Sequence, residues 1–205
     1  MIQAIPEQVT FDQFIEWIPE NSQTRYELHN RAIVEMSQPL GGHEEIIGFL
    51  VTKLVVEYSR LKLPYFVPRQ ALVKAASRVS GYFPDIMLLN RPNLATEPLW
   101  ENASTITQGS SIPLVVEVVS TNWRDDYFVK FTDYEEIGIP EYWIADYLGL
   151  GGKRFIGDCK QPTLSVCQLI DGEYQVKKFR EKDRIESLVF PELDLTVEQV
   201  FQWER

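Results

Sequence analysis

Two stretches of the 205-residue chain are almost continuously hydrophobic, and each of them contains one carboxylate. Asp85 lies in the first, residues 83–89, and Glu117 lies in the second, residues 114–119. Short apolar runs of this kind are typical of buried strands. A carboxylate inside such a strand must be paired, protonated or bound to a cation, because an isolated buried charge costs several kcal/mol or more. The pattern therefore predicts neighbouring strands whose two carboxylates are suited to a divalent metal ion.

A third segment, residues 125–134, has helical rather than strand spacing. Asp126, Lys130 and Tyr134 fall on one face of this predicted helix, because residues four apart are neighbours on a helix surface. We therefore expect Lys130 to lie over the sheet edge that presents Glu117, with Asp126 next to its ammonium group. The alternative is an ordinary surface lysine in an ion pair with Asp126.

Hydrophobic periodicity predicts the remaining elements in an α/β order. In the early hairpin, Glu27 and Glu35 are candidates to point toward the same cleft. The loop over residues 90–112 is long for a plain connection, which is typical of loops that border a binding cleft or move. The predicted elements are helices over 10–18, 43–60 and 197–201, hairpins over 25–36 and 164–179, and strands over 65–73, 81–89, 113–119 and 140–145.

Composition fits one α/β domain over residues 1–205, since a chain that is 44% hydrophobic at this length can bury a substantial core. Cys159 and Cys167 have no C-x-x-C spacing, so we expect reduced thiols and no zinc site. The N-terminus has no basic leader, and the apolar runs are far too short to span a membrane. We therefore expect a cytoplasmic protein.

The formal net charge of −10 argues against general affinity for nucleic acid, whose binding depends on Lys and Arg neutralising phosphates. The charge is uneven, however. Residues 58–84 contain no Asp or Glu and carry +5, which leaves −15 for the rest of the chain. These basic residues are either solvated strand and loop residues or an edge that tracks phosphates. They are Arg60, Lys62, Arg69, Lys74 and Arg78.

Nucleophile chemistry finds little support in the sequence. The chain has no G-x-S-x-G elbow, no G-x-x-x-x-G-K-[ST] loop, no H-E-x-x-H and only two histidines. These missing motifs argue against triad hydrolases and P-loop enzymes. The glycine-rich residues 149–153 match no nucleotide-binding spacing, so we interpret them as a flexible turn.

The remaining motifs resemble the PD-(D/E)XK nuclease superfamily and, within it, the Uma-two family of restriction endonucleases. The resemblance covers nearly the whole chain and implies a restriction-endonuclease-like fold. This is an αβββαβ core with a mixed central sheet flanked by helices, here with an added N-terminal hairpin and a C-terminal hairpin. The residues that carry the resemblance are Tyr26-Glu27-Leu28, His43, Pro84-Asp85, Val116-Glu117-Val118-Val119-Ser120, Lys130, Tyr134, Gly138, Glu141-Tyr142-Trp143 and Asp146.

The resemblance implies a Mg²⁺-dependent endonuclease that hydrolyses DNA, with Mn²⁺ as a substitute metal. Asp85 and Glu117 would hold the metal together with a backbone carbonyl such as that of Val118, because Mg²⁺ prefers oxygen ligands. The usual lysine position, two residues after the acidic residue, is occupied by Val119. The resemblance therefore assigns to Lys130 the role of orienting or activating the attacking water.

Supporting roles and partners follow from the same resemblance. His43 and Glu44 open a helix where the superfamily sometimes supplies another acidic ligand, although Glu44 also suits the positive end of a helix. The superfamily leans toward homodimers. Two alternatives remain: a non-catalytic binding or assembly scaffold that keeps the fold, which the acidity supports, and a nuclease acting on RNA or on branched or damaged DNA.

Overall fold

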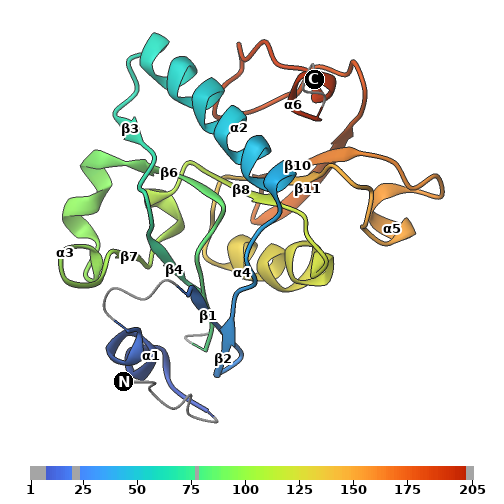
Figure 1. Cartoon of the computed structure of the whole chain (residues 1–205). Helices are drawn as coiled ribbons and strands as arrows, with labels where there is room; N and C mark the ends of the chain where they lie inside the picture. Colours follow the sequence, from blue (N-terminus) through green and yellow to red (C-terminus); the bar gives the residue numbers. More distant parts are fainter. Residues whose placement is uncertain (1–7, 20–23, 77–78, 202–205) are drawn as a thin grey trace.

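The computed structural model describes residues 8–19, 24–76 and 79–201 (Figure 1). Its helices are α1 (Phe11–Trp17), α2 (Gly41–Arg60), α3 (Trp100–Ala103), α4 (Lys130–Glu136), α5 (Lys153–Ile156) and α6 (Val197–Phe201), with 3₁₀ turns η1 (Arg91–Thr96) and η2 (Gly109–Ser111) and a π-helical turn η3 (Asp125–Val129). Its strands are β1 (Tyr26–His29), β2 (Ala32–Glu35), β3 (Tyr65–Phe66), β4 (Leu72–Lys74), β5 (Gly81–Tyr82), β6 (Ile86–Asn90), β7 (Thr105–Ile106), β8 (Leu114–Val118), β9 (Glu141–Asp146), β10 (Thr163–Ile170) and β11 (Glu173–Phe179).

These strands form two mixed sheets. The larger has six strands in the order β11-β10-β9-β8-β6-β3, with β8 and β9 parallel and the other neighbours antiparallel. The smaller has five strands in the order β2-β1-β5-β4-β7. Helices α2 and α4 lie on opposite sides of the six-stranded sheet (Figure 1). The expected mixed sheet flanked by helices is confirmed.

The side-chain alternation of β8 decides what each face of the six-stranded sheet contacts. Leu114, Val116 and Val118 pack in one core with α2 and α6. Val115 and Val119 pack in a second core with α4. Each fully buried aliphatic side chain stabilises the fold by about 1.5–3 kcal/mol. Because successive side chains point to opposite faces, Glu117 shares the face of Val115 and Val119, toward α4.

Two strands were predicted as continuous, and that prediction is wrong. Each predicted strand is two strands, one in each sheet. The predicted strand 65–73 is β3 in the six-stranded sheet and β4 in the five-stranded sheet. The predicted strand 81–89 is likewise β5 and β6. Proline interrupts both, Pro68 in the first and Pro84 in the second, because it has no N–H for a strand ladder. The chain therefore crosses between the sheets at these two prolines.

The loop over residues 90–112 contains short elements: η1, α3, β7 and η2. Buried Glu97 organises it by accepting hydrogen bonds from the backbone N–H and hydroxyl of Thr107 and from the N–H of Gln108. No residue of this loop lines either of the two cavities described below. The predicted hairpins are present as β1–β2 and β10–β11, and the predicted terminal helix is α6.

Glu141, part of the motif on β9, is buried away from both cavities. It accepts hydrogen bonds from the indole of Trp143, the hydroxyl of Ser187 and the backbone N–H groups of Leu188 and Val189. This carboxylate therefore ties the segment that leads to α6 onto the sheet. Within the described residues, no helix is long and apolar enough to cross a membrane.

Candidate active site

Asp85 and Glu117 lie on adjacent strands of the six-stranded sheet. Asp85 immediately precedes β6, Glu117 is in β8, and the two strands pair antiparallel with Ile86 opposite Val116. The backbone N–H of Val118 donates to Oδ2 of Asp85 at 2.8 Å. The two carboxylates therefore reach the same cavity, which both of them line.

Pro84 explains why the Val118 carbonyl has no partner in the strand ladder. Continuing the register of β6 and β8 by two residues puts Pro84 opposite Val118. In an antiparallel pair, the N–H and the carbonyl of one residue point toward the same neighbouring strand. The Val118 N–H donates to Asp85, so the Val118 carbonyl also points toward the chain that leads into β6. Pro84 has no N–H to donate to that carbonyl. The Val118 carbonyl therefore receives no strand hydrogen bond from Pro84, and it interacts with the His43 ring instead.

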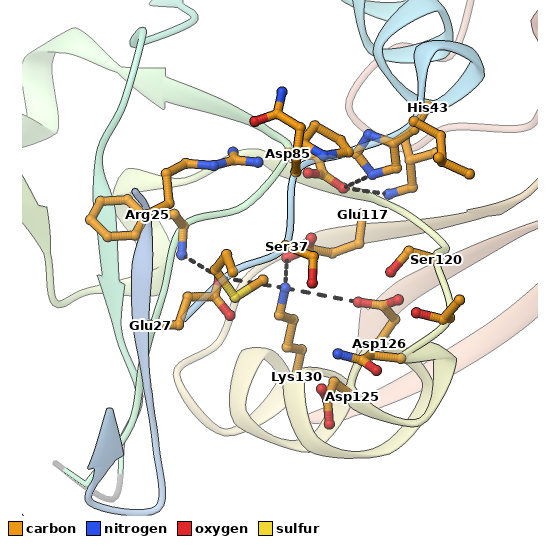
Figure 2. Close-up of a pocket in the computed structure, with 18 of the residues that line it drawn as sticks. Arg25, Glu27, Ser37, His43, Asp85, Glu117, Ser120, Asp125, Asp126 and Lys130 are labelled. Carbon is orange, nitrogen blue, oxygen red and sulfur yellow. Dashed lines mark hydrogen bonds and ion pairs between the residues drawn. The ribbon is translucent and has the colours of Figure 1, made fainter. Parts of the chain in front are cut away.

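Lys130 reaches Glu117 from the helical segment on the α4 side of the sheet. The preceding turn η3 is a π-helix in which the N–H of Lys130 donates to the Asp125 carbonyl, one residue wider than an α-helical turn. The Lys130 ammonium lies 3.0 Å from Oε1 of Glu117 and 3.8 Å from Oδ1 of Asp126. Figure 2 shows this ammonium between the two carboxylates.

Glu27, on β1 of the five-stranded sheet, completes the surroundings of this lysine. Its Oε1 lies 3.7 Å from the Lys130 ammonium, and its Oε2 lies 2.8 Å from the ring of His29. Both sheets therefore contribute to the site. We call Glu27, Asp85, Glu117 and Asp126 the carboxylate cluster; Glu27 and Glu117 are 1% and 2% exposed.

The acids of the carboxylate cluster differ in how easily they ionise, because several of them share one lysine. Burial alone would lower the pKa of Lys130, but the charges of Glu117 and Glu27 raise it, so the lysine stays an ammonium. Burial opposes ionisation of Glu27, yet the Lys130 charge holds its pKa below the ordinary value. Burial raises the pKa of Asp126 well above the ordinary value.

Glu117 is the group whose ionisation is most finely balanced. Burial raises its pKa to about 7, with the Lys130 charge opposing the rise and the Asp85 and Glu27 charges adding to it. Its Oε1 also accepts a hydrogen bond of 2.8 Å from the hydroxyl of buried Tyr134. The other oxygen, Oε2, takes part in neither the lysine nor the tyrosine contact. That oxygen is therefore available to a ligand.

His43 and Glu44, at the start of α2, have different surroundings. The His43 ring lies 3.2 Å from Oδ2 of Asp85 and lines the cavity. Burial would lower the pKa of His43, but the hydrogen bond and charge of Asp85 raise it, with a smaller contribution from the Val118 carbonyl. The Glu44 side chain is 56% exposed, lies 3.7 Å from the His43 ring and does not line the cavity.

The cavity has a volume of about 300 Å³ and is enclosed by both sheets, the start of α2 and the η3 turn. Glu27 and Glu35, the hairpin candidates, both line it. The polar segment after β8 also lines the cavity, with Ser120, Thr121, Asn122 and Asp125. Ser120 ends the motif around Glu117 and Asp125 begins the helical segment, but neither was predicted as a site residue, and Thr121 and Asn122 belong to no motif. The turn between β8 and η3 brings all four to the cavity.

The donor groups fit a hydrated divalent cation. Within the described part of the chain, no three His, Cys, Asp or Glu side chains are arranged as a metal site. The available ligands are instead Asp85, Glu117 and the Val118 carbonyl, a set of oxygens that leaves positions for water, as Mg²⁺ prefers. The His43 ring, whose cationic form is favoured, already lies against Asp85.

Comparison with known proteins agrees with the fold and its motifs. A solved structure described as a putative nuclease belonging to DUF820, from Anabaena variabilis ATCC 29413, has a TM-score of 0.71. The two chains are 16% identical, and the similarity covers 94% of this chain and 97% of the other. No curated protein matches this chain.

This chain shares the mixed α/β fold of that solved structure, with two mixed sheets flanked by helices. Residues 11–198 match the family model of Uma2, described as "Putative restriction endonuclease". The chain therefore belongs to the Uma2 family, and the resemblance of its motifs to that family is confirmed.

Proposed function

We propose that this protein is a Mg²⁺-dependent endonuclease that hydrolyses phosphodiester bonds of DNA. The observation that carries the proposal is the meeting of Asp85, Glu117 and the Lys130 ammonium in one cavity, although they come from two strands and a helix. Three buried acidic side chains, Glu27, Glu117 and Asp126, surround one buried lysine, and this excess of acids supports a metal ion as an additional positive charge.

Asp85, Glu117 and the carbonyl of Val118 are the proposed metal ligands. A bound Mg²⁺ supplies Lewis-acid stabilisation of phosphate charge and lowers the pKa of a coordinated water. Glu117 must lose its proton to act as a ligand, and Lys130 favours its ionised form. Mn²⁺ offers the same preference for oxygen ligands and is the expected substitute.

Lys130 acts as a cation in this proposal rather than as a base, because its ammonium form is the one that the surrounding carboxylates stabilise. An ammonium has three N–H donors and no acceptor. It can therefore orient the attacking water by donating a hydrogen bond and stabilise negative charge that develops on the phosphate. His43 is a positioning residue that holds Asp85 in place.

Calorimetric titration of Mn²⁺ and Mg²⁺ into wild type, Asp85→Asn and Glu117→Gln is the direct test. We expect saturable binding to wild type and its loss, about tenfold or more in affinity, in both variants. Glu97→Gln is the matched control, because Glu97 is a buried carboxylate in the loop over residues 90–112 that lines neither cavity.

Cleavage assays then separate the catalytic proposal from a binding or assembly scaffold. DNA should be cut by wild type with Mg²⁺ and left intact by Lys130→Met, while that variant still binds metal. RNA and branched DNA of matched length test the substrate class. The proposal is wrong if Asp85→Asn and Glu117→Gln cut as wild type does, or if wild type neither binds metal nor cuts any of these substrates.

A further inference from the structure

A second cavity lies directly beside the candidate active site. Its volume is about 470 Å³, and its walls are Arg25 together with residues 69–71 and 83–85. The two cavities share three wall residues: Arg25, Phe83 and Asp85. The second cavity therefore opens next to one of the proposed metal ligands, at the place where the chain crosses between the two sheets.

Two arginines give this second cavity a positive wall. Arg25 precedes β1, and Arg69 lies in the crossing segment between β3 and β4. Both are exposed, and neither forms an ion pair with an acidic side chain in the portion of the chain that the structure describes. In Figure 2 the guanidinium group of Arg25 points toward Asp85.

The absence of such pairing is notable in a chain of net charge −10. Two other members of the basic stretch over residues 58–84 are engaged within the protein: Arg60 pairs with two glutamates, and Lys74 lies 3.6 Å from Asp12. Arg69 instead faces a cavity next to the site. Of the two interpretations of the basic stretch, solvated residues or a phosphate-tracking edge, the structure favours the second for Arg69.

A phosphodiester approaching Asp85 and Glu117 meets the repulsion of the carboxylate cluster. A guanidinium group counters this repulsion, because it offers paired N–H donors that match two phosphate oxygens. Arginines that stay free of carboxylates keep those donors available.

We propose that the second cavity binds a backbone phosphate of the DNA strand whose cleaved bond lies at Asp85 and Glu117, with Arg25 and Arg69 as the phosphate-binding residues. This inference rests on the proposed function, because it places the strand by reference to that site. The contact is to the backbone, so it adds affinity and fixes the position of the strand without selecting a base sequence.

DNA binding is measured without cleavage, by fluorescence anisotropy of a labelled oligonucleotide duplex in EDTA at several salt concentrations. We expect Arg25→Gln and Arg69→Gln each to weaken binding about 3- to 10-fold, and to reduce the salt slope by about one per arginine. A duplex of different sequence should be affected equally.

Arg31→Gln is the matched control. Arg31 is an exposed arginine at the turn of the same hairpin as Arg25, it lines neither cavity, and its substitution changes the net charge by the same amount. This control should bind DNA as wild type does. The inference is overturned if the Arg25 and Arg69 variants bind as wild type does, if the Arg31 variant weakens binding equally, or if wild type binds no DNA.

Failure of this inference is distinguishable from failure of the proposed function. Metal binding by wild type and its loss in Glu117→Gln do not depend on either arginine. If wild type binds metal and cuts DNA while the Arg25 and Arg69 variants do so with unchanged KM, the second cavity is not a phosphate site and the proposed function stands. A raised KM with nearly unchanged kcat in these variants supports the inference.

Discussion

At the scale of single residues, Lys130 has the least ordinary environment in the described structure. Its side chain is 6% exposed, and three carboxylates of the carboxylate cluster lie within 4 Å of its ammonium. The buried charge is tolerated only because these partners are present. The same contacts also hold Glu27 ionised.

Lys130→Met should destabilise the metal-free protein by about 3–5 kcal/mol at pH 8, because it removes the lysine partner of the buried Glu27 carboxylate. The Lys130 charge lowers the pKa of Glu27, so its stabilising effect is present above the ordinary pKa of 4.5 and is lost as pH falls through the lowered value. Without the lysine, Glu27 protonates more easily, so the loss of stability in Lys130→Met should be smaller at pH 5. Urea unfolding of wild type and variant in EDTA at both pH values measures this loss.

Lys153→Met provides the control for that measurement, since Lys153 is 70% exposed and lies 4.0 Å from its carboxylate partner. It should change stability by less than about 1 kcal/mol. A loss for Lys130→Met that is no larger than that of this control would contradict the importance of the buried ion pairs.

Glu117 should make the metal-free protein less stable as pH rises from 4.5 to 7. Its pKa is raised from 4.5 to about 7 in the folded state, so the folded protein binds the proton more tightly than the unfolded chain does in this window. The free energy of unfolding should fall by up to about 1.4 kcal/mol per pH unit there and level off above pH 7.

Glu117→Gln removes this titration, so the stability difference between wild type and variant isolates it. Thermal or urea unfolding across pH 5–8 in EDTA supplies the comparison. Parallel curves for the two proteins would show that Glu117 does not titrate in this range.

At the scale of elements, β8 and β9 are the parallel pair of the six-stranded sheet, and their buried glutamates have different roles. Strand β8 carries Glu117 to the cavity, whereas β9 directs Glu141 to the segment that leads to α6. Glu141, in the Glu-Tyr-Trp part of the motif, therefore has a structural role and does not contribute to the cavity. Asp146, at the end of β9, similarly accepts the N–H groups of Leu150 and Gly151 and fixes the turn there.

Glu141→Ala should destabilise the protein by about 2–5 kcal/mol, because four donors lose a buried acceptor. Mn²⁺ affinity of the folded variant should stay within about threefold of wild type, since Glu141 lines neither cavity. Urea unfolding and calorimetry at a temperature where the variant is folded test the two parts. A large loss of Mn²⁺ affinity would instead place Glu141 in the metal site.

At the scale of the whole molecule, the site depends on the docking of the two sheets. Glu27 and Arg25 come from the hairpin that leads into the five-stranded sheet, while Asp85 and Glu117 belong to the six-stranded sheet. A ligand that neutralises the carboxylate cluster therefore stabilises the association of both sheets.

The oligomeric state of the whole molecule is a separate question, and the homodimer expected from the family resemblance stays a prediction.

Mn²⁺ should raise the melting temperature of wild type, because a ligand that binds only the folded state stabilises it by about 2.7 kcal/mol at 100 times Kd. EDTA should reverse the rise, and Asp85→Asn should lose most of it. Differential scanning calorimetry at pH 8, where Glu117 is ionised, is the measurement. Equal shifts in wild type and Asp85→Asn would indicate metal bound elsewhere on this acidic chain.

The sequence by itself determined the strands around Asp85 and Glu117, the helical face with Asp126 and Lys130, and the family. Those features are local, since periodicity along a short segment decides which side chains share a face. The sequence also contains Pro68 and Pro84. The strand propensity of residues 65–73 and 81–89 nevertheless predicted one continuous strand in each range, although each range is divided between the two sheets.

Only the tertiary structure decided which residues meet. The distance of 3.7 Å between Glu27 and Lys130 joins segments about one hundred positions apart, and the paired arginine wall joins residues 25 and 69. Such contacts depend on how the two sheets pack, and hydrophobic periodicity along a short segment does not predict that packing. The pKa of Glu117 near 7 has the same origin, because burial and the charges around it exist only after the sheets and the η3 turn have enclosed the cavity.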